Sequence, residues 1–141
     1  MSSTMEALDV GSRDDAALLL GRLLIVVLFV LYGWDKLFGF SGTITEMVHN
    51  HLPLPAVAAA IAVIMEFFVG LAIAVGIFTR PLALLLAIYT LATAFIGHHY
   101  WTMSGPQHGG SMINFYKNVS IVGGLLVLSV SGAGRYSLDH K

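Results

Sequence analysis

Four long apolar runs constrain what this chain of 141 residues can fold into. They occupy residues 16–34, 55–78, 81–98 and 113–130, and no run contains more than one Asp, Glu, Lys or Arg. About 20 apolar residues in a helix cross a hydrocarbon core of roughly 30 Å. The runs lack the period-two alternation of short membrane-barrel strands. They therefore predict an all-α fold, a four-helix transmembrane bundle.

The composition agrees with a membrane protein and excludes several function classes. The chain is 57% hydrophobic and 11% charged, against about 25% charged residues in soluble proteins, so the lipid bilayer is its expected surrounding. The net charge of -1 and the lack of a basic stripe argue against nucleic-acid binding. Because there is no cysteine, the chain forms no disulfide and holds no thiolate-ligated metal. Any redox chemistry must use a borrowed group.

The segments that flank the runs predict a tail and an orientation. Residues 1–15 carry four acidic side chains and lack the basic region of a cleaved signal peptide. We expect a flexible cytoplasmic tail over residues 1–15 and one membrane domain over residues 16–139. Basic residues near helix ends stay on the cytoplasmic side, which favours cytoplasmic termini. The side with both termini would hold Arg13, Arg22, Arg80, Arg135 and Lys141, and the other side only Lys36 and Lys117.

Two connections have recognisable signals. The stretch 78–81 is very short, and Pro81 suits the first turn of a helix, so the second and third spans should form an antiparallel hairpin. In the first outer loop, Thr43 and Glu46 match a capping box, and apolar residues follow at helical spacing. This pattern predicts a short interfacial helix, with an ordered loop as the alternative.

Glu66, near the middle of the second run, poses the functional question. A carboxylate at that depth costs roughly 3 kcal/mol or more unless it is paired or used. Ala59, Ala62, Gly70 and Ala74 share its helix face, and such small residues let a neighbouring helix approach closely. With about 1.5 Å of rise per residue, its depth is closer to that of Arg22 than to that of Lys117. Both a structural ion pair and a proton or ligand site fit.

Polar residues of the other spans could converge on this carboxylate. Arg22 and Lys36 share a face of the first helix, and Asn114, Lys117 and Asn118 share a face of the fourth. If these faces meet, the outer half of the bundle contains a polar pocket with apolar walls that suits a headgroup such as a quinone ring. The candidate binding residues are Arg22, Lys36, Glu66, His98, His99, Trp101, Asn114, Lys117 and Asn118.

Each of these residues, taken alone, also fits a simpler role. Lysines near helix ends extend toward the interface, and aromatic residues such as Tyr100 and Trp101 are common there. The histidines do not favour a metal site, because those that lie close in sequence are not three or four residues apart. No metal is therefore expected.

Several short motifs follow one another along the four runs. They are Gly21-Arg22, Gly33 with Asp35-Lys36, Glu66 with Gly70, Gly76-Ile-Phe-Thr-Arg80, Asn114-Phe-Tyr-Lys-Asn118, Gly123-Gly124 and Gly132-Ala-Gly-Arg-Tyr-Ser-Leu-Asp139. Their order and spacing resemble the DoxX family of small bacterial inner-membrane proteins. The resemblance covers residues 16–139 and implies a four-helix membrane bundle associated with redox systems. The family takes its name from a subunit of a thiosulfate:quinone oxidoreductase. Some wider relatives carry cysteine pairs, which this chain lacks.

Three hypotheses follow from the residues and the resemblance together. The leading one is a subunit or accessory factor of a quinone-linked redox process, with a redox partner protein and a polar intramembrane site. The second is a proton-coupled transporter of small solutes that uses Glu66 and works as a homo-oligomer. The third is a non-catalytic scaffold for assembling membrane proteins, in which Glu66 is structural. Whether the chain is itself catalytic stays open at this point.

Overall fold

The computed structural model describes residues 2–139, with side chains from residue 11 onward. Four segments are long and apolar enough to cross a membrane, namely Gly11–Phe38, Pro55–Val75, Thr79–Thr102 and Pro106–Ser131. The part of the chain that is described contains no strand. The expected all-α bundle with four spans is confirmed. The division into a flexible tail over residues 1–15 and a domain over residues 16–139 stays a prediction.

The first helix, α1 (Ser2–Phe38), is followed by the short helix α2 (Phe40–His49). The second span consists of α3 (Pro55–Val63), a π-helical segment η1 (Ile64–Val69) and α4 (Gly70–Val75). The third span is α5 (Thr79–Gly97), and the 3-10 turn η2 (Tyr100–Thr102) leads to the fourth, α6 (Pro106–Ser131). A short segment, residues 132–139, ends the described chain.

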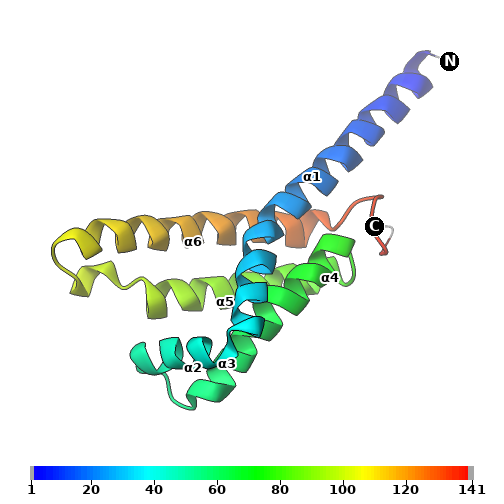
Figure 1. Ribbon diagram of the computed structural model, residues 1–141. Coiled ribbons are helices and arrows are strands. Elements are labelled where there is room, and N and C mark those ends of the chain that lie inside the picture. Colours follow the sequence, from blue (N-terminus) through cyan, green and yellow to red (C-terminus); the bar gives the residue numbers. More distant parts are fainter. Residues whose placement is uncertain (1, 140–141) are drawn as a thin grey trace.

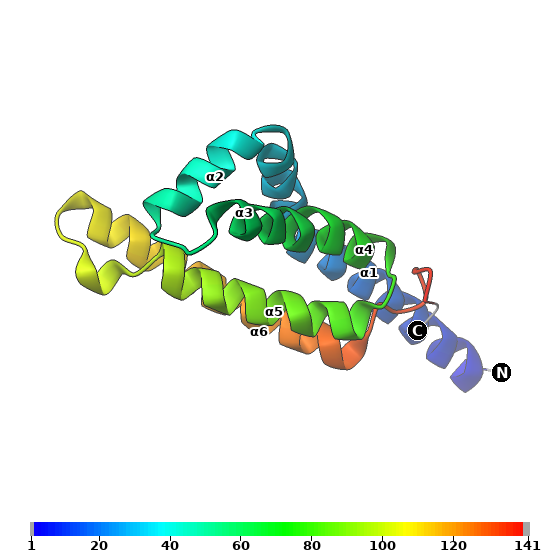
Figure 2. The same cartoon turned by 90° about the horizontal axis from the view of Figure 1, so that it is seen from below.

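The spans form two pairs (Figures 1 and 2). The lower half of α1 packs along α3, η1 and α4, while α5 and α6 lie side by side and antiparallel. One end of the bundle, called here the α2 end, carries α2 and the connection from α5 to α6. The opposite end, called the terminal end, carries the turn from α4 to α5 and residues 132–139. The α1 helix crosses α6 at an angle, so the two helices diverge toward the α2 end.

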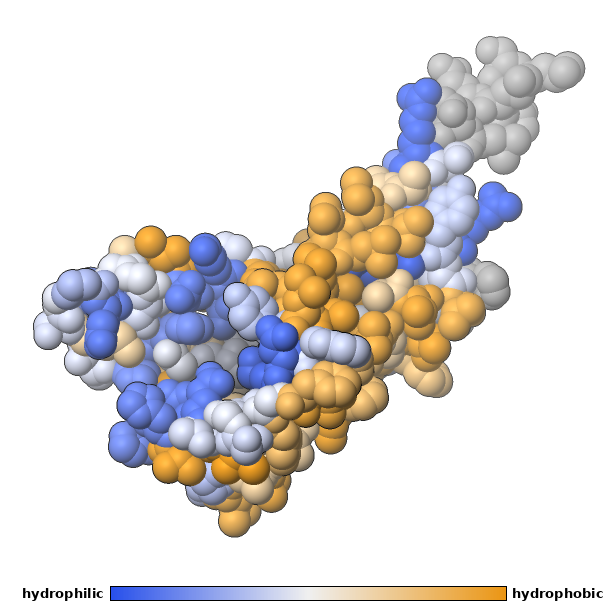
Figure 3. All heavy atoms as spheres, in the orientation of Figure 1, coloured by the Kyte–Doolittle hydropathy of each residue, from blue (hydrophilic) through white to orange (hydrophobic). Residues whose placement is uncertain are grey.

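The core lies where the two pairs meet. Its most buried side chains include Val26, Ile73, Leu86 and Leu125, each at most 2% exposed. Large apolar side chains such as Leu24, Ile88 and Val127 are more than half exposed, and apolar residues cover much of the surface around α1 (Figure 3). In water this surface would be unfavourable, and in a bilayer it faces lipid chains.

The connections confirm the hairpin and the short helix, with two differences in detail. The α5 helix begins at Thr79 with Pro81 in its first turn, as expected. The α2 helix begins at Phe40 without a side-chain cap, so the capping box is wrong. Thr43 lies inside the helix instead and donates its hydroxyl to the carbonyls of Lys36 and Gly39.

The fourth span starts earlier than hydropathy indicates. The α6 helix begins at Pro106, directly after its N-cap residue Gly105, rather than near residue 113. Proline at the first helical position has φ already set for a helix and lacks only an N–H that would be unpaired there. The extra turns contain Gln107, His108 and Ser111, which is why a hydropathy criterion leaves them out. Lys117 therefore lies about 16 Å from the start of its helix.

Candidate functional site

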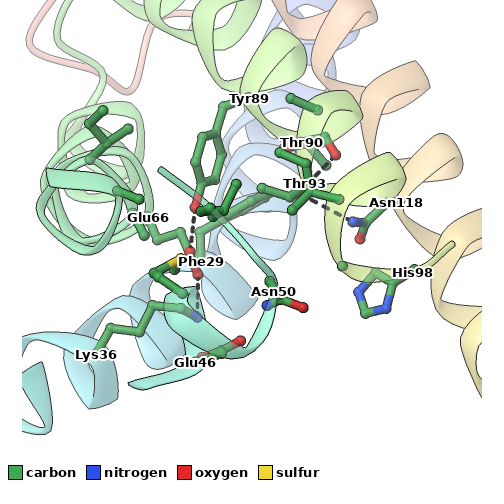
Figure 4. A pocket seen from close by; sticks show the side chains of 18 of the residues that line it. Phe29, Lys36, Glu46, Asn50, Glu66, Tyr89, Thr90, Thr93, His98 and Asn118 are labelled. Carbon is green, nitrogen blue, oxygen red and sulfur yellow. Dashed lines mark hydrogen bonds and ion pairs between the residues drawn. The ribbon is translucent and has the colours of Figure 1, made fainter. Parts of the chain in front are cut away.

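A cavity of about 600 Å³ lies between α1, α2, the α3 and η1 part of the second span, α5 and α6. Its walls combine apolar side chains with a group of polar ones (Figure 4). In Figure 3 hydrophilic residues surround a hollow on the face turned to the viewer, near the α2 end. The polar lining residues are Lys36, Glu46, His49, Asn50, Glu66, Tyr89, Thr90, Thr93, His98 and Asn118. The volume is in the range of pockets that bind small organic molecules.

Glu66 lies at the centre of the polar wall, and both of its carboxylate oxygens are engaged. The Nζ of Lys36 contacts Oε1 at 3.1 Å, and the Tyr89 hydroxyl donates a hydrogen bond to Oε2 at 2.7 Å. The side chains of Lys36 and Glu66 are 19% and 11% exposed. The ammonium of Lys36 also lies 5.7 Å from the centre of the Tyr32 ring. The buried carboxylate thus has a charged partner and a neutral donor from two different helices.

The local fold explains how Lys36 reaches Glu66. The carboxylate lies within η1, where the backbone follows the wider i to i+5 pattern, a rare geometry that is frequent at functional sites. Gly33 of α1 is packed so closely here that a Cβ on it would lie 2.5 Å from the backbone nitrogen of Phe67. One turn after Phe67 in the second span, Gly70 lies against Val30 and Phe29 of α1. The close crossing brings Lys36 to the level of Glu66.

A second polar group faces the charged one across the cavity. Thr93 and Asn118 are joined by a long hydrogen bond of 3.5 Å from the Asn118 amide. His98 lies beside them, and Asn50 enters from the connection after α2 (Figure 4). The cavity therefore offers hydrogen-bonding groups at two sides, and its lining also includes apolar residues such as Phe29 and Ile121.

Arg22 belongs to a different cluster, at the terminal end of the bundle. It is 2% exposed and donates hydrogen bonds to the carbonyls of Ala74, Ala133 and Tyr136. These carbonyls lie at the end of α4 and in residues 132–139. The depth comparison that favoured Arg22 over other partners of Glu66 is wrong, because it assumed parallel straight helices and α1 crosses the second span.

The same end is closed by the last described residues. The Asp139 carboxylate accepts hydrogen bonds from the backbone N–H groups of Phe78 and Thr79, each at 3.0 Å, and thus pairs donors at the start of α5 that have no helical partner. Gly76 adopts φ +79°, and a Cβ there would clash with Ser137. The cluster at the terminal end therefore contains Arg22, Gly76 and Asp139, which belong to the motifs that carry the family resemblance.

The structure separates the sequence-predicted site residues into four groups. Lys36, Glu66, His98 and Asn118 line the cavity. Arg22 lies at the terminal end, while Asn114 and Lys117 are exposed on α6. Trp101 packs with Phe95, Tyr100 and Phe115 in an aromatic cluster near the connection between α5 and α6. His99 lies 6.4 Å from the Trp101 ring and uses its Nδ1 to contact the carbonyl of Ile96.

Sequence reasoning missed Tyr89, which is the closest partner of Glu66 by distance. One signal could have found it, since a tyrosine in the interior of a span needs a partner for its hydroxyl. Tyr89 is about 13 Å from His98 along its helix, and Glu66 is about 16 Å from Pro55, so their depths match. Glu46 and Asn50 were also missed, because their positions depend on how α2 folds back over the spans.

No ligand set for a metal ion is present among the described residues. Groups of three or more His, Asp or Glu that could hold a metal do not occur within residues 2–139. The arrangement favours hydrogen bonding to an organic molecule over metal coordination.

Comparisons with known proteins give consistent relatives. A family model described as DoxX matches residues 17–99. Inner membrane protein YphA of Escherichia coli is 46% identical over 139 residues, covering 99% of each chain. Inner membrane protein YqjF of Escherichia coli is 37% identical over 127 residues, covering 90% of this chain and 92% of YqjF. The ER-derived vesicles protein ERV29 of Saccharomyces cerevisiae is 24% identical over 94% of this chain, which spans 37% of ERV29. No solved structure matches significantly.

Proposed function

This chain belongs to the DoxX family, and we propose that it is a quinone-binding subunit or accessory factor of a redox process in the bacterial inner membrane. Two of its relatives bear the name inner membrane protein. The observation that carries the proposal is the cavity whose polar wall is built by Lys36, Glu66 and Tyr89. Charged side chains inside a membrane span cost free energy, and a functional role explains why they are present.

The chemistry of the two polar walls fits a flat ring with polar groups on opposite edges. A quinone carries two carbonyl oxygens and needs donors, which Lys36 supplies on one side and Asn118 and His98 supply on the other. A hydroquinone carries two hydroxyls and needs acceptors, and the Glu66 carboxylate is one. The apolar residues between the walls suit the faces of the ring.

The chain contains no cysteine, so it cannot transfer electrons through a thiol of its own. Because the chain contains no thiol, we propose that a redox partner exchanges electrons with the bound quinone. Glu66, Lys36 and Tyr89 bind and orient the headgroup, and Glu66 accepts a hydrogen bond or a proton from the reduced form. This role makes the chain a subunit or accessory factor rather than a complete enzyme.

The proposal is tested by purifying the protein gently in lipid nanodiscs and identifying bound quinones by mass spectrometry. We expect quinone with the wild-type protein, and at least about tenfold less with Glu66→Gln, a loss of about 1.4 kcal/mol in binding. The matched control is Asp35→Asn, which removes a carboxylate charge from the same end at an exposed position outside the cavity lining. Wild-type protein without quinone, or equal quinone in all variants, contradicts the proposal.

A second candidate function rests on the exposed polar face of α6. Lys117 and Asn114 are exposed although they lie well inside the span, and Lys117 has no ion pair among the described residues. A charge that faces lipid is unfavourable, so this face favours a scaffold or assembly role in which α6 contacts another membrane protein or a second copy. Cross-linking in membranes tests it. The cross-linked species should disappear with Lys117→Leu, and unchanged cross-linking contradicts it.

We also propose that both termini lie in the cytoplasm. Arg13, Arg80 and Arg135 are exposed at the terminal end, and such residues are retained on the cytoplasmic side. Arg22 contributes little to this count because it is buried, and Lys141 lies outside the described residues. A reporter enzyme that is active only outside the cytoplasm should be inactive when it is fused after residue 141. An active fusion contradicts the orientation.

A further inference from the structure

The helices α1 and α6 touch at one crossing and then separate. A Cβ on Gly124 of α6 would lie 3.4 Å from the Cδ1 of Ile25 on α1, which is an ordinary contact distance. From this point α6 and α1 run in different directions toward the α2 end (Figure 1). The hollow surrounded by hydrophilic residues lies on the face that this divergence leaves open (Figure 3).

The cavity reaches into the angle between the two helices. Leu28 and Phe29, about one turn beyond Ile25 on α1, belong to its lining, and so does Ile121, about one turn before Gly124 on α6. The cavity therefore extends from the Glu66 network to a gap that is bordered by apolar side chains. Leu28 is 45% exposed, so this border is also part of the outer surface.

The gap is bordered by residues from the middle of two membrane-spanning helices. Leu28 lies ten residues before Phe38, the last residue of the first span, and Ile121 lies ten residues before Ser131, the last residue of the fourth span. Both spans are long and apolar enough to cross a hydrocarbon core of roughly 30 Å. The border of the gap therefore belongs to the membrane-spanning part of the bundle.

We propose that this gap is a side entrance through which a membrane quinone reaches the cavity and in which its isoprenoid tail stays. This inference rests on the proposed function and names the form of the ligand, a tailed quinone from the bilayer instead of a small water-soluble ring. A cavity of about 600 Å³ holds a headgroup, and the tail must leave it. Leu28, Phe29 and Ile121 are apolar residues of the cavity lining at this gap, and a hydrocarbon tail can lie against them between the headgroup site and the bilayer.

The chain itself offers a direct test, because it contains no cysteine. In the double variant Leu28→Cys and Ile121→Cys, a short reversible thiol cross-linker bridges the gap. The matched control is Ile25→Cys with Gly124→Cys, which joins the same helices at their crossing and leaves the gap free. Two probes are compared in nanodiscs, a benzoquinone headgroup without a tail and the same headgroup with an isoprenoid tail.

We expect the cross-link across the gap to weaken binding of the tailed quinone at least about tenfold, equivalent to about 1.4 kcal/mol. Binding of the tail-free headgroup should change less than about twofold. Reduction of the cross-linker should restore binding of the tailed quinone. The control pair should bind both probes when it is cross-linked. Binding of the tail-free headgroup by both double variants before cross-linking shows that they are folded, and each variant's binding of the tailed quinone is compared with its own value before cross-linking.

The possible failures are distinguishable. If the protein that is cross-linked across the gap binds both probes as before, the side entrance is overturned and the quinone site is left intact. If the uncross-linked wild-type protein binds neither probe, the proposed function is overturned and the side entrance with it. If a phospholipid chain occupies the gap and is not displaced by the tailed quinone, the assignment of the tail is overturned.

Discussion

Gly33 of α1 lies directly against the backbone of Phe67, the residue that follows Glu66. The space between them has no room for a side chain, since a Cβ on Gly33 would be 2.5 Å from the Phe67 nitrogen and 2.8 Å from its Cα. This contact fixes the crossing of α1 over η1, and Lys36 is one turn of α1 further on. The Lys36 to Glu66 pair therefore depends on a glycine that carries no chemistry of its own.

Replacing Gly33 by alanine should destabilise the protein by at least about 2 kcal/mol, because the new methyl group meets backbone atoms that cannot turn away. Thermal unfolding in nanodiscs measures the change. Gly21→Ala is the control on the same helix, where nothing lies within 4 Å of the new Cβ, and it should be neutral or stabilise by up to about 1 kcal/mol. Equal effects of the two substitutions would show that the crossing is not tight.

Tyr89→Phe removes the 2.7 Å hydrogen bond to Glu66 and leaves the ring in place. Because the acceptor is a carboxylate in a mostly apolar surrounding, we expect a loss of about 1–3 kcal/mol in the free energy of unfolding. Tyr116→Phe is the matched control, since its hydroxyl lies on the surface 3.4 Å from that of Tyr100, and it should change stability by less than about 0.5 kcal/mol. If Tyr89→Phe leaves the free energy of unfolding unchanged, the Tyr89 hydroxyl does not stabilise the Glu66 carboxylate.

Lys36 and Glu66 should be energetically coupled. Lys36→Met leaves the carboxylate with Tyr89 alone and should destabilise more than the double variant Lys36→Met with Glu66→Gln. A coupling energy of about 1–3 kcal/mol is expected, below the values of fully buried pairs because the Lys36 side chain is 19% exposed. Unfolding of the two single variants and the double variant gives this number. Simple additivity of the single effects would mean that the contact contributes nothing.

Arg22→Lys should loosen the terminal end without affecting the cavity. Lysine cannot reach the carbonyls of Ala74, Ala133 and Tyr136 with several nitrogens at once. Hydrogen exchange of residues 132–139 should therefore become at least about tenfold faster, while quinone binding stays as in the wild-type protein. Arg80→Lys is the control, because Arg80 is exposed and its hydrogen bond to the Ser131 carbonyl is long, at 3.4 Å. Unchanged exchange in Arg22→Lys would contradict the role of the guanidinium.

Parts of the fold that follow from local chemistry could be predicted from the sequence. The four spans follow from apolar length, the hairpin from Pro81, and the buried face of the second span from the small residues around Glu66. Ala59 and Ala62 are indeed at most 2% exposed. The depth of Glu66 was also sufficient to show that it needs a partner.

The identity of that partner depends on geometry that a sequence does not display. Counting rise along straight parallel helices compared Glu66 with Arg22 and Lys117, whereas the crossing at Gly33 brings Lys36 to it. The π-helical segment changes the direction of side chains within one span, and no local sequence signal announces it. Tyr89 was within reach of the same depth argument, and it was missed because only charged residues were compared.

The last eight described residues have a consequence for how the protein is made. Asp139 caps the start of α5, and the carbonyls of Ala133 and Tyr136 accept from Arg22 of α1. During translation these residues are made after all four spans, because they follow α6 in the chain. Arg22 and the start of α5 therefore gain these hydrogen-bond partners only when the segment after α6 has been made. A stop codon at position 132 would yield a chain that inserts into the membrane and fails to reach its folded state.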